Sequence, residues 1–305
     1  MSESGSEPAT RCGFVALLGA PNAGKSTLSN ALVGAKVSIV TPKVQTTRAR
    51  MLAIGLHKQS QIVFVDTPGI FRSARRRLER AMVDAAWTGA EHADVRLFLL
   101  DAERGRDPDS DAILAHLRSV RSGAVLVLNK IDLVKRESLL ALAAALNEEA
   151  EFARTFMVSA LTGDGVDDLR TYLAESVPEG PWHYPEDQLA DVPQRLLAAE
   201  ITREQIFLQL HQELPYATTV ETESWKEQRD GSVRIEQVVY IRRETQKAIV
   251  LGKGGRRIQE IGRKAREELA QILGCPVHLF LFVKVRENWQ DDPARYREMG
   301  LDYPR

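Results

Sequence analysis

Short apolar runs alternate with stretches of helical spacing through the first half of the chain. We interpret the runs as buried strands at residues 14–18, 62–65, 95–100, 124–128 and 155–158. Helical spacing lies between them, at residues 28–32, 78–90, 110–120 and 138–151. Strands that alternate with helices predict a mostly parallel sheet covered on both faces. Residues 51–56 are expected to add one more strand, at an antiparallel edge.

The pattern changes after residues 178–193, a segment with four prolines and few apolar positions in register. We therefore predict a first domain at 11–178, a linker at 179–192 and a second domain at 193–290. The second domain is expected to be α+β, with the order helix 192–212, strand 217–226, strand 232–242, helix 244–251, helix 256–273 and strand 277–285. Asp-Gly at 230–231 predicts a hairpin turn. Residues 1–10 and 291–305 are predicted tails.

Composition adds few constraints to this two-domain interpretation. The 305 residues are 44% hydrophobic and carry a formal net charge of −1, so no whole-molecule field favours nucleic acid or membrane. Cys12 and Cys275 are too few for a disulfide scaffold or a metal site, which is typical of a reduced, cytosolic protein. The chain has no apolar run near the roughly 20 residues that span a bilayer. Its first ten residues do not resemble a signal peptide. We expect a soluble monomer without a disulfide partner.

Residues 19–26 match the phosphate-binding pattern G-x-x-x-x-G-K-[ST]. The match follows a predicted strand and opens a predicted helix, which is the context that the motif requires. Lys25 is expected to reach the β- and γ-phosphates, and the Ser26 hydroxyl to bind Mg²⁺. The predicted phosphate contacts are Asn22, Ala23, Gly24, Lys25, Ser26 and Thr27.

A second motif, Asn129-Lys130-Ile131-Asp132, indicates which nucleotide is bound. Asp132 offers two acceptor oxygens to the N1–H and N2 amino donors of guanine, whereas adenine would leave the carboxylate unpaired. The Lys130 stem is expected to lie along the base. Ser159, Ala160 and Leu161 follow another predicted strand, and the Ala160 N–H is expected to bind guanine O6.

Two polar segments predict a Mg²⁺ and γ-phosphate switch. Asp66 follows a predicted strand and is expected to hold Mg²⁺, and the Gly69 N–H to bind the γ-phosphate. Thr47 is favoured as a further Mg²⁺ ligand, with Thr46 left open. The predicted metal ligands are Ser26, Thr47 and Asp66, and the predicted catalytic groups are Lys25, Thr47 and Gly69.

Ile70 follows Gly69, where Ras-type enzymes carry the glutamine that orients water. Because isoleucine has no amide, we hypothesise that other groups hold the attacking water and that unaided hydrolysis is slow. The nearby basic run Arg75-Arg76-Arg77 either contacts RNA or the second domain, or is simply solvated.

The second domain carries a Gly-x-x-Gly loop between two predicted helices. Such a loop clamps the backbone of single-stranded RNA in some domains, although it also occurs as a plain helix–helix turn. Residues 242–266 hold nine Lys/Arg and two acidic residues, a net of 9 − 2 = +7. This charge, with the element order, favours RNA binding over a solvated basic face. The predicted RNA contacts are Gly252, Lys253, Gly254, Gly255, Arg256 and Arg257.

The whole chain resembles the Era family of bacterial GTPases, which end in a type II KH domain. The most similar segments are residues 21–27, 45–48, 213–217, 252–255, 276–279 and 283–285, followed by Trp289 and Asp291. The resemblance spans about 290 residues, and the linked order of motifs carries it. It implies an α/β P-loop GTPase domain followed by a type II KH domain. It also implies binding to the single-stranded 3′ end of 16S ribosomal RNA, a role in maturing the small ribosomal subunit, and loose association with the inner membrane.

Two other functions compete with a GTP-dependent RNA-binding switch. One is a signalling or trafficking GTPase whose second domain binds a protein or membrane partner, and the loop at 252–255 argues against it. The other is an RNA-binding module with a degenerate nucleotide site, which the intact Lys25, Ser26, Asp66 and Asp132 argue against.

Overall fold

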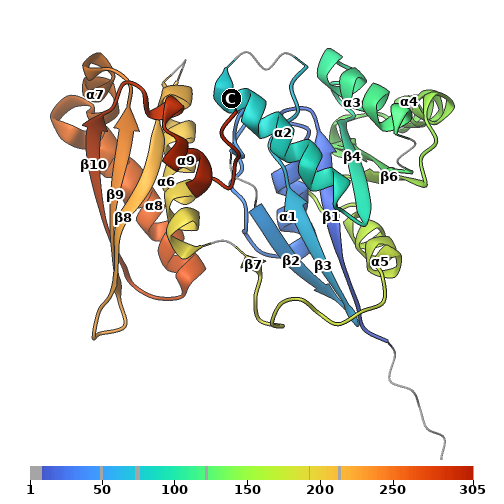
Figure 1. Ribbon diagram of the computed structural model, residues 1–305, viewed down its shortest axis with the longest axis horizontal. Coiled ribbons are helices and arrows are strands. Elements are labelled where there is room, and N and C mark those ends of the chain that lie inside the picture. Colours follow the sequence, from blue (N-terminus) through green and yellow to red (C-terminus); the bar gives the residue numbers. More distant parts are fainter. Residues whose placement is uncertain are drawn as a thin grey trace, which may run out of the picture. The chain divides into compact units, whose positions relative to one another are not determined.

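The computed structural model describes residues 9–48, 51–72, 76–120, 123–191, 193–211 and 214–304. The chain folds into two compact units (Figure 1). The first unit holds Met1–Ser38, Thr47–Asp191 and Gly300–Arg305, and the second holds Ile39–Thr46 and Val192–Met299.

The first unit is built on a sheet whose strands, in the described residues, follow the order β6-β5-β4-β1-β3-β2-β7. The central strand β1 (Arg11–Gly19) pairs in parallel with β3 (Ser60–Asp66) and β4 (Val95–Asp101). The sheet continues in parallel through β5 (Val125–Asn129) and β6 (Arg154–Val158). Because β1 lies between β3 and β4, the strand order reverses there, which is where open α/β sheets bind ligands.

The antiparallel strand β2 (Met51–His57) is not the edge of this sheet. It pairs antiparallel with β3, as expected, but β7 (Ala190–Asp191) pairs with its other side. The proline-rich stretch that we interpreted as linker therefore contributes a short strand. Its polar sequence hides the strand, because two residues are too few to show an alternating pattern.

Helices cover both faces of the first sheet. One buried cluster joins the sheet to α1 (Lys25–Val33) and α5 (Val166–Ser176), through side chains such as Leu28 and Leu169. The opposite cluster joins it to three more helices, with Ala86, Ile113 and Leu146 among its members. These helices are α2 (Arg77–Glu91), α3 (Pro108–Ser119) and α4 (Arg136–Glu149).

The second unit has a three-stranded sheet of order β10-β9-β8 in the described residues. Its strands are β8 (Thr219–Glu227), β9 (Val233–Ile241) and β10 (Val277–Val285), with β9 antiparallel to β8 and parallel to β10. The predicted hairpin turn is confirmed, since Gly231 has φ 80° and its N–H donates to the Gln228 carbonyl.

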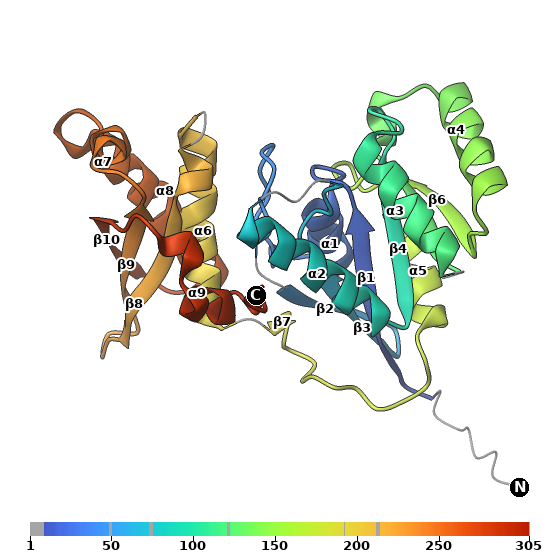
Figure 2. The same ribbon diagram turned by 45° about the horizontal axis from the view of Figure 1, so that its top comes forward.

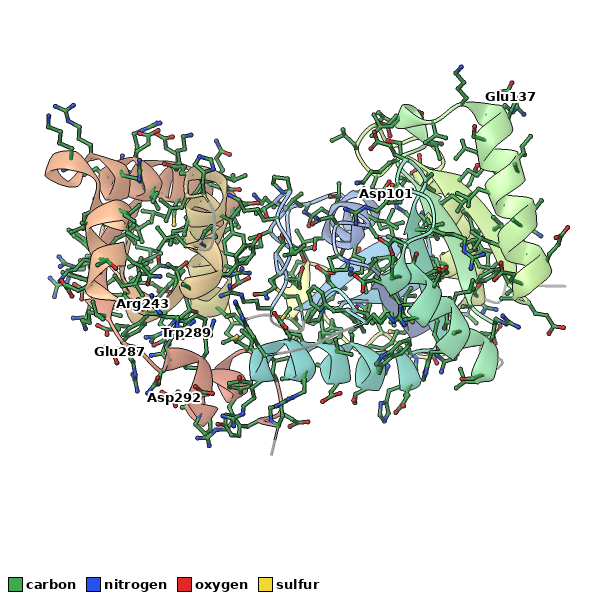
Figure 3. The ribbon with its side chains drawn as sticks, turned by 90° about the horizontal axis from the view of Figure 1, so that it is seen from above. Asp101, Glu137, Arg243, Glu287, Trp289 and Asp292 are labelled. Carbon is green, nitrogen blue, oxygen red and sulfur yellow. The ribbon has the colours of Figure 1, made fainter. Side chains whose placement is uncertain are left out.

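Helices α6 (Gln194–Gln209) and α8 (Arg256–Leu273) lie side by side on that sheet, and α7 (Glu244–Leu251) precedes α8 (Figure 2). A further helix, α9 (Pro293–Glu298), follows β10. Trp289, labelled in Figure 3, anchors the connection to α9: it is fully buried and its indole N–H donates to the Ala217 carbonyl. The predicted C-terminal tail thus contains a helix.

The described helices include none that is long and apolar enough to cross a membrane. Among the same residues there is no group of three or more His, Cys, Asp or Glu side chains placed to hold a metal ion by themselves. Cys12 and Cys275 are free, and burial raises the pKa of the Cys12 thiol.

Candidate functional site

The P-loop runs from the end of β1 into the first turn of α1, as its sequence predicts. Gly24 ends the loop with φ 96°, and a Cβ there would lie 2.2 Å from Asn129 Nδ2. Glycine is therefore required at this position for both its backbone conformation and its space. The loop presents backbone N–H groups and the positive end of a helix dipole, a combination that binds phosphate.

Lys25 lies beneath this loop with only 6% of its surface exposed. Its ammonium donates to the carbonyls of Gly19 (2.9 Å) and Ala20 (3.0 Å). Burial lowers the pKa of Lys25 to about 8, and the nearby Asp66 carboxylate opposes that shift. The P-loop carbonyls thus hold the Lys25 ammonium in place, away from solvent.

Three predicted metal ligands meet beside the loop. The Ser26 and Thr47 hydroxyls lie 2.9 Å apart. Asp66 is fully buried, and in the described residues neither of its oxygens has a partner of hydrogen-bonding geometry. Burial raises the pKa of Asp66, and hydroxyls nearby, those of Ser26, Ser38 and Thr47, partly offset that rise together with Lys25.

This arrangement fits Mg²⁺. A buried carboxylate without partners is costly, and a hard divalent cation would satisfy it. The two hydroxyls supply further oxygen ligands of the type that Mg²⁺ prefers, and the remaining positions suit phosphate oxygens and water.

The two candidate threonines differ in what their hydroxyls contact. The Thr46 hydroxyl lies 2.6 Å from the Thr41 hydroxyl and donates to the Lys43 carbonyl (2.6 Å). The Thr47 hydroxyl instead faces Ser26. Of the two, it is thus the Thr47 hydroxyl that lies beside Ser26, and Thr47 is the threonine that the sequence favoured as a metal ligand.

A cavity of about 170 Å³ lies where the guanine base is expected. It is lined by Gly24, Thr27, Asn129, Lys130, Asp132, Leu133, Ser159, Ala160 and Leu161. The structure thus gathers the guanine motif and the Ser159–Leu161 loop around one space that opens beside the P-loop helix.

Asn129 joins two of the loops that line this cavity. Its amide donates to the Ala23 carbonyl (2.9 Å), and its Oδ1 accepts from the Ala160 N–H (3.0 Å). The Ala160 N–H, which we predict to bind guanine O6, thus lies at the edge of the cavity and also joins two loops. A bond to the base would have to share it.

Sequence reasoning missed two side chains near the nucleotide site. Asp101, at the end of β4 (Figure 3), accepts from the Lys130 ammonium at 2.5 Å and so orients the lysine of the guanine motif. Its position at the carboxyl end of a predicted strand was a usable signal. Ser38 has no such signal, since it is a loop serine brought to Asp66 only by the fold.

The residues after Asp66 lie close to the P-loop. A Cβ on Gly69 would come within 3.0 Å of Pro21 Cα, so this backbone packs directly against the loop. Ile70 is 3% exposed and belongs to the apolar cluster under α2 and α3. Its side chain is used in packing, consistent with the hypothesis that it does not orient water.

The basic run before α2 has separate roles within the described residues, and Arg75 lies outside them. The Arg76 N–H donates to the Glu79 carboxylate at the helix start (3.0 Å). The Arg77 guanidinium donates to the Tyr303 hydroxyl and lies 5.0 Å from the centre of its ring. Arg77 is thus engaged by the end of the chain.

The Gly-x-x-Gly loop connects α7 to α8 in the second unit. Gly252, Gly254 and Gly255 all have positive φ, at 69°, 62° and 76°. Nothing lies within 4 Å of a Cβ built at Gly254, so that backbone is open to a ligand. Lys253, Arg256 and Arg257 are exposed around it.

Acidic partners neutralise part of the positive charge that follows the loop in α8. Farther along α8, Arg263 is paired with Glu260 and Glu267, and Lys264 approaches Glu260. Arg257 donates to the Ile249 carbonyl (2.9 Å), which leaves its charge uncompensated. Lys253, Arg256 and Arg257 thus place positive charge beside the accessible backbone of the loop.

Comparisons with known proteins match both parts of the chain. A family of 50S ribosome-binding GTPases matches residues 14–130, and the KH domain family matches residues 213–290. GTPase Era of Bradyrhizobium sp. (strain ORS 278) is 65% identical over 297 residues, which are 97% of this chain and 96% of that protein. GTPase Era of Sinorhizobium medicae (strain WSM419) is 65% identical over 296 residues, 97% of this chain and 95% of that protein.

Two solved structures resemble the chain over 95% of its length and 99% of theirs, each with a TM-score of 0.90 and 38% identity. One is Era in complex with MgGDPNP and nucleotides 1506–1542 of 16S ribosomal RNA. The other is a variant of Aquifex aeolicus Era bound to GDP and AlF₄⁻.

Proposed function

Since this chain belongs to the Era family of GTPases, we propose that it is a GTP-dependent switch that binds the single-stranded 3′ end of 16S ribosomal RNA. It hydrolyses GTP and uses Mg²⁺. The observation that carries the RNA proposal is the exposed basic loop at 252–255, in a chain that resembles RNA-bound Era over 95% of its length. Assistance in maturing the small ribosomal subunit follows from that RNA.

For the nucleotide site we propose the following roles. The P-loop amides and Lys25 hold the phosphates, and Asp132 recognises guanine from the cavity that it lines. Ser26, Thr47 and Asp66 hold Mg²⁺, which neutralises charge on the phosphates and lowers the barrier to hydrolysis when bound. Gly69 senses the γ-phosphate. The orphaned buried oxygens of Asp66 support the metal assignment.

For the RNA site we propose that residues 252–257 clamp the RNA backbone. The open Gly254 backbone lets phosphates approach, and the N-terminus of α8 with Lys253, Arg256 and Arg257 supplies donors. We propose domain limits of 11–178 for the GTPase domain and 193–290 for the KH domain, with β7 as an addition to the sheet of the first unit and α9 as an addition to the second. We also propose a cytoplasmic location with loose inner-membrane association, which rests on the family resemblance and is tested by cell fractionation.

The test is a filter-binding assay with a single-stranded oligonucleotide of the 16S 3′ end, in the presence of GDP or a GTP analogue. We expect tighter, sequence-dependent binding in one nucleotide state. A scrambled oligonucleotide of equal length and charge is the control, because it retains the phosphate attraction but not the base contacts. Equal, weak and sequence-blind binding in both states would rule out the switch.

A further inference from the structure

The loop between Ser38 and Thr47 belongs to two parts of the molecule. Its interior, Ile39–Thr46, is part of the second unit, whereas Ser38 and Thr47 belong to the first. We call Ile39–Thr46 the clasped segment. The chain passes from one unit to the other at the two peptide bonds that flank it, and both flanking residues lie at the Mg²⁺ site.

The start of the clasped segment is anchored by packing and by a carboxylate. Ile39 is 1% exposed and belongs to the same apolar cluster as Ala198 and Ile201 of α6. The next residue, Val40, donates its backbone N–H to the Glu204 carboxylate of α6 at 2.7 Å. A charged acceptor makes this a strong bond at a partly buried position.

The middle of the segment is held by the end of the same helix. The Lys43 ammonium donates to the carbonyls of Phe207 and Leu210, the latter at 2.6 Å. These carbonyls belong to the helix end, where acceptors otherwise have no partner within the helix. Burial lowers the pKa of Lys43, in keeping with an ammonium drawn out of water to reach them.

The end of the segment is held by Arg203, which is 1% exposed. Its guanidinium pairs with the Glu200 carboxylate (Nε to Oε1, 2.8 Å) and donates to the carbonyls of Gln45 (3.3 Å) and Thr46. A planar group with five donors can serve a carboxylate and two carbonyls at once, which an ammonium cannot.

Both residues that leave the segment reach the metal site. Thr46, whose carbonyl Arg203 binds, is followed directly by Thr47, whose hydroxyl faces Ser26 at 2.9 Å. At the other end, Ile39 is preceded by Ser38, whose buried hydroxyl lies near the Asp66 carboxylate. Contacts to α6 thus fix the chain one residue away from each hydroxyl.

We propose that Arg203 is a positioning residue for the Mg²⁺ site, acting through the Thr46 carbonyl on Thr47. Glu200 orients the guanidinium, and Glu204 and Lys43 hold the rest of the clasped segment. The first helix of the RNA-binding unit thereby controls how tightly the GTPase site holds its metal. This inference rests on the proposed ligand role of Thr47 and goes beyond it.

The test compares four variants with the wild type. Because truncation of Arg203 alone would leave Glu200 buried and unpaired, the main variant is Glu200→Leu/Arg203→Met, which replaces the ion pair by apolar side chains of similar size. Arg203→Lys keeps the positive charge but loses the planar guanidinium that can donate to a carboxylate and two carbonyls at once. Thr47→Ala removes the proposed ligand itself. The matched control is Arg195→Met, because Arg195 also lies on α6 and donates to two backbone carbonyls, those of Thr222 and Glu223.

The first readout is the Mg²⁺ concentration that half-maximally slows release of a fluorescent, non-hydrolysable GTP analogue. We expect a rise of about 10- to 100-fold for Thr47→Ala and about 10-fold for Glu200→Leu/Arg203→Met, as for groups that orient metal ligands. The Mg²⁺ midpoint of Arg203→Lys should lie between those of the double variant and the wild type. GDP affinity in EDTA should stay within about twofold throughout, since the phosphate loop is untouched.

The second readout needs neither nucleotide nor metal. Hydrogen exchange, followed by mass spectrometry on peptides spanning 39–48, should be faster in the double variant than in Arg195→Met. A double variant that matches Arg195→Met in both Mg²⁺ midpoint and exchange would overturn the positioning role. If Thr47→Ala leaves the Mg²⁺ midpoint unchanged, the ligand assignment itself is wrong, and the inference falls with it.

Discussion

The proposed nucleotide site and the proposed RNA loop present their charged groups in opposite ways. At the phosphate end of the nucleotide site the charged groups are inside the protein: Lys25 is 6% exposed and Asp66 is fully buried, whereas Asp132 at the base end is exposed. Around the Gly252–Gly255 loop, Lys253, Arg256 and Arg257 are all exposed. The phosphate end of the nucleotide site is therefore buried and preorganised, whereas the RNA loop is exposed and solvated.

This difference has a physical consequence for selectivity. Buried charges have lost their hydration, so each demands a partner in a fixed place, and a wrong ligand leaves an expensive gap. Exposed charges remain hydrated and screened by salt, so they attract any phosphate backbone and discriminate little. We therefore expect single changes at the nucleotide site to have larger and more ligand-specific effects than changes at the RNA loop.

The largest effect is expected from Asp132→Asn, which tests base selectivity at the nucleotide site. Loss of two charge-assisted hydrogen bonds, at about 1.5–3 kcal/mol each, should weaken GTP binding by about 100- to 10,000-fold. Xanthosine triphosphate carries a carbonyl where guanine has its amino group, so it should bind the variant better than GTP does. Competition titrations against a fluorescent nucleotide measure the affinities for GTP and for xanthosine triphosphate. Equal losses for the two nucleotides would refute this recognition scheme.

The buried charge of Lys25 predicts a pH dependence of stability in the nucleotide-free protein. Its pKa is about 8 in the folded chain against 10.5 as the ordinary value. Between these values the unfolded chain binds the proton and the folded chain does not, so the free energy of unfolding rises with pH. The gain is about 3 kcal/mol across this window. Urea titrations should show this slope in the difference between wild type and Lys25→Met, and a flat difference would contradict it.

At the RNA loop, Gly254→Asp should weaken RNA binding by about 10- to 100-fold while GTP hydrolysis without RNA is unchanged. Gly254 has φ 62°, so a side chain strains the loop, and the added carboxylate repels phosphate. Gly231→Asp is the matched control, because Gly231 also has positive φ (80°) but lies in the hairpin of β8 and β9. The idea fails if both variants lose RNA affinity equally.

A smaller effect, on the salt dependence of RNA binding, is expected to distinguish Arg256 from the ion-paired Arg263. Arg256→Gln should reduce the slope of log affinity against log salt by about one, because one phosphate contact is lost. Arg263→Gln should change that slope little, since Glu260 and Glu267 already neutralise this guanidinium. Filter binding at several salt concentrations measures both slopes. Identical slopes for the two variants would show that pairing in α8 does not focus the charge.

The smallest effect on catalysis is expected from Ile70→Ala. The side chain packs in the core, so its truncation should lower stability by about 2–4 kcal/mol and leave kcat within about threefold where the protein is folded. Thermal melting and single-turnover hydrolysis separate these effects. Abolished hydrolysis with intact nucleotide affinity would mean that Ile70 acts directly on the reaction.

Short sequence patterns were enough to predict which residues gather at the two proposed sites. A phosphate loop, a guanine motif and a Gly-x-x-Gly loop each depend on neighbours within about ten residues, and their chemistry follows from residue type and spacing. The strand that precedes each motif also predicted which motifs would share the ligand edge of the sheet. The cavity lined by Asn129, Asp132 and Ala160 confirms that grouping.

Contacts between distant segments lay beyond the sequence. The residues around Thr46 and Thr47 favoured Thr47 but did not exclude Thr46, and they gave no sign of the bond from Arg203 to the Thr46 carbonyl, 157 residues away along the chain. The sequence likewise gave no sign that the Ala160 N–H donates to the side chain of Asn129, 31 residues away. Nor did it indicate β7, whose two residues form a strand only because β2 offers an open edge.

The amino-acid sequence by itself determined the nucleotide, the metal chemistry and the RNA loop, because those properties reside in short motifs with their own backbone requirements. Tertiary structure decided how the motifs are held: which threonine faces the metal site, which arginine is free, and which helix secures the loop between Ser38 and Thr47. The reason is that burial and pairing depend on all the groups around a residue, and the fold alone brings those groups together.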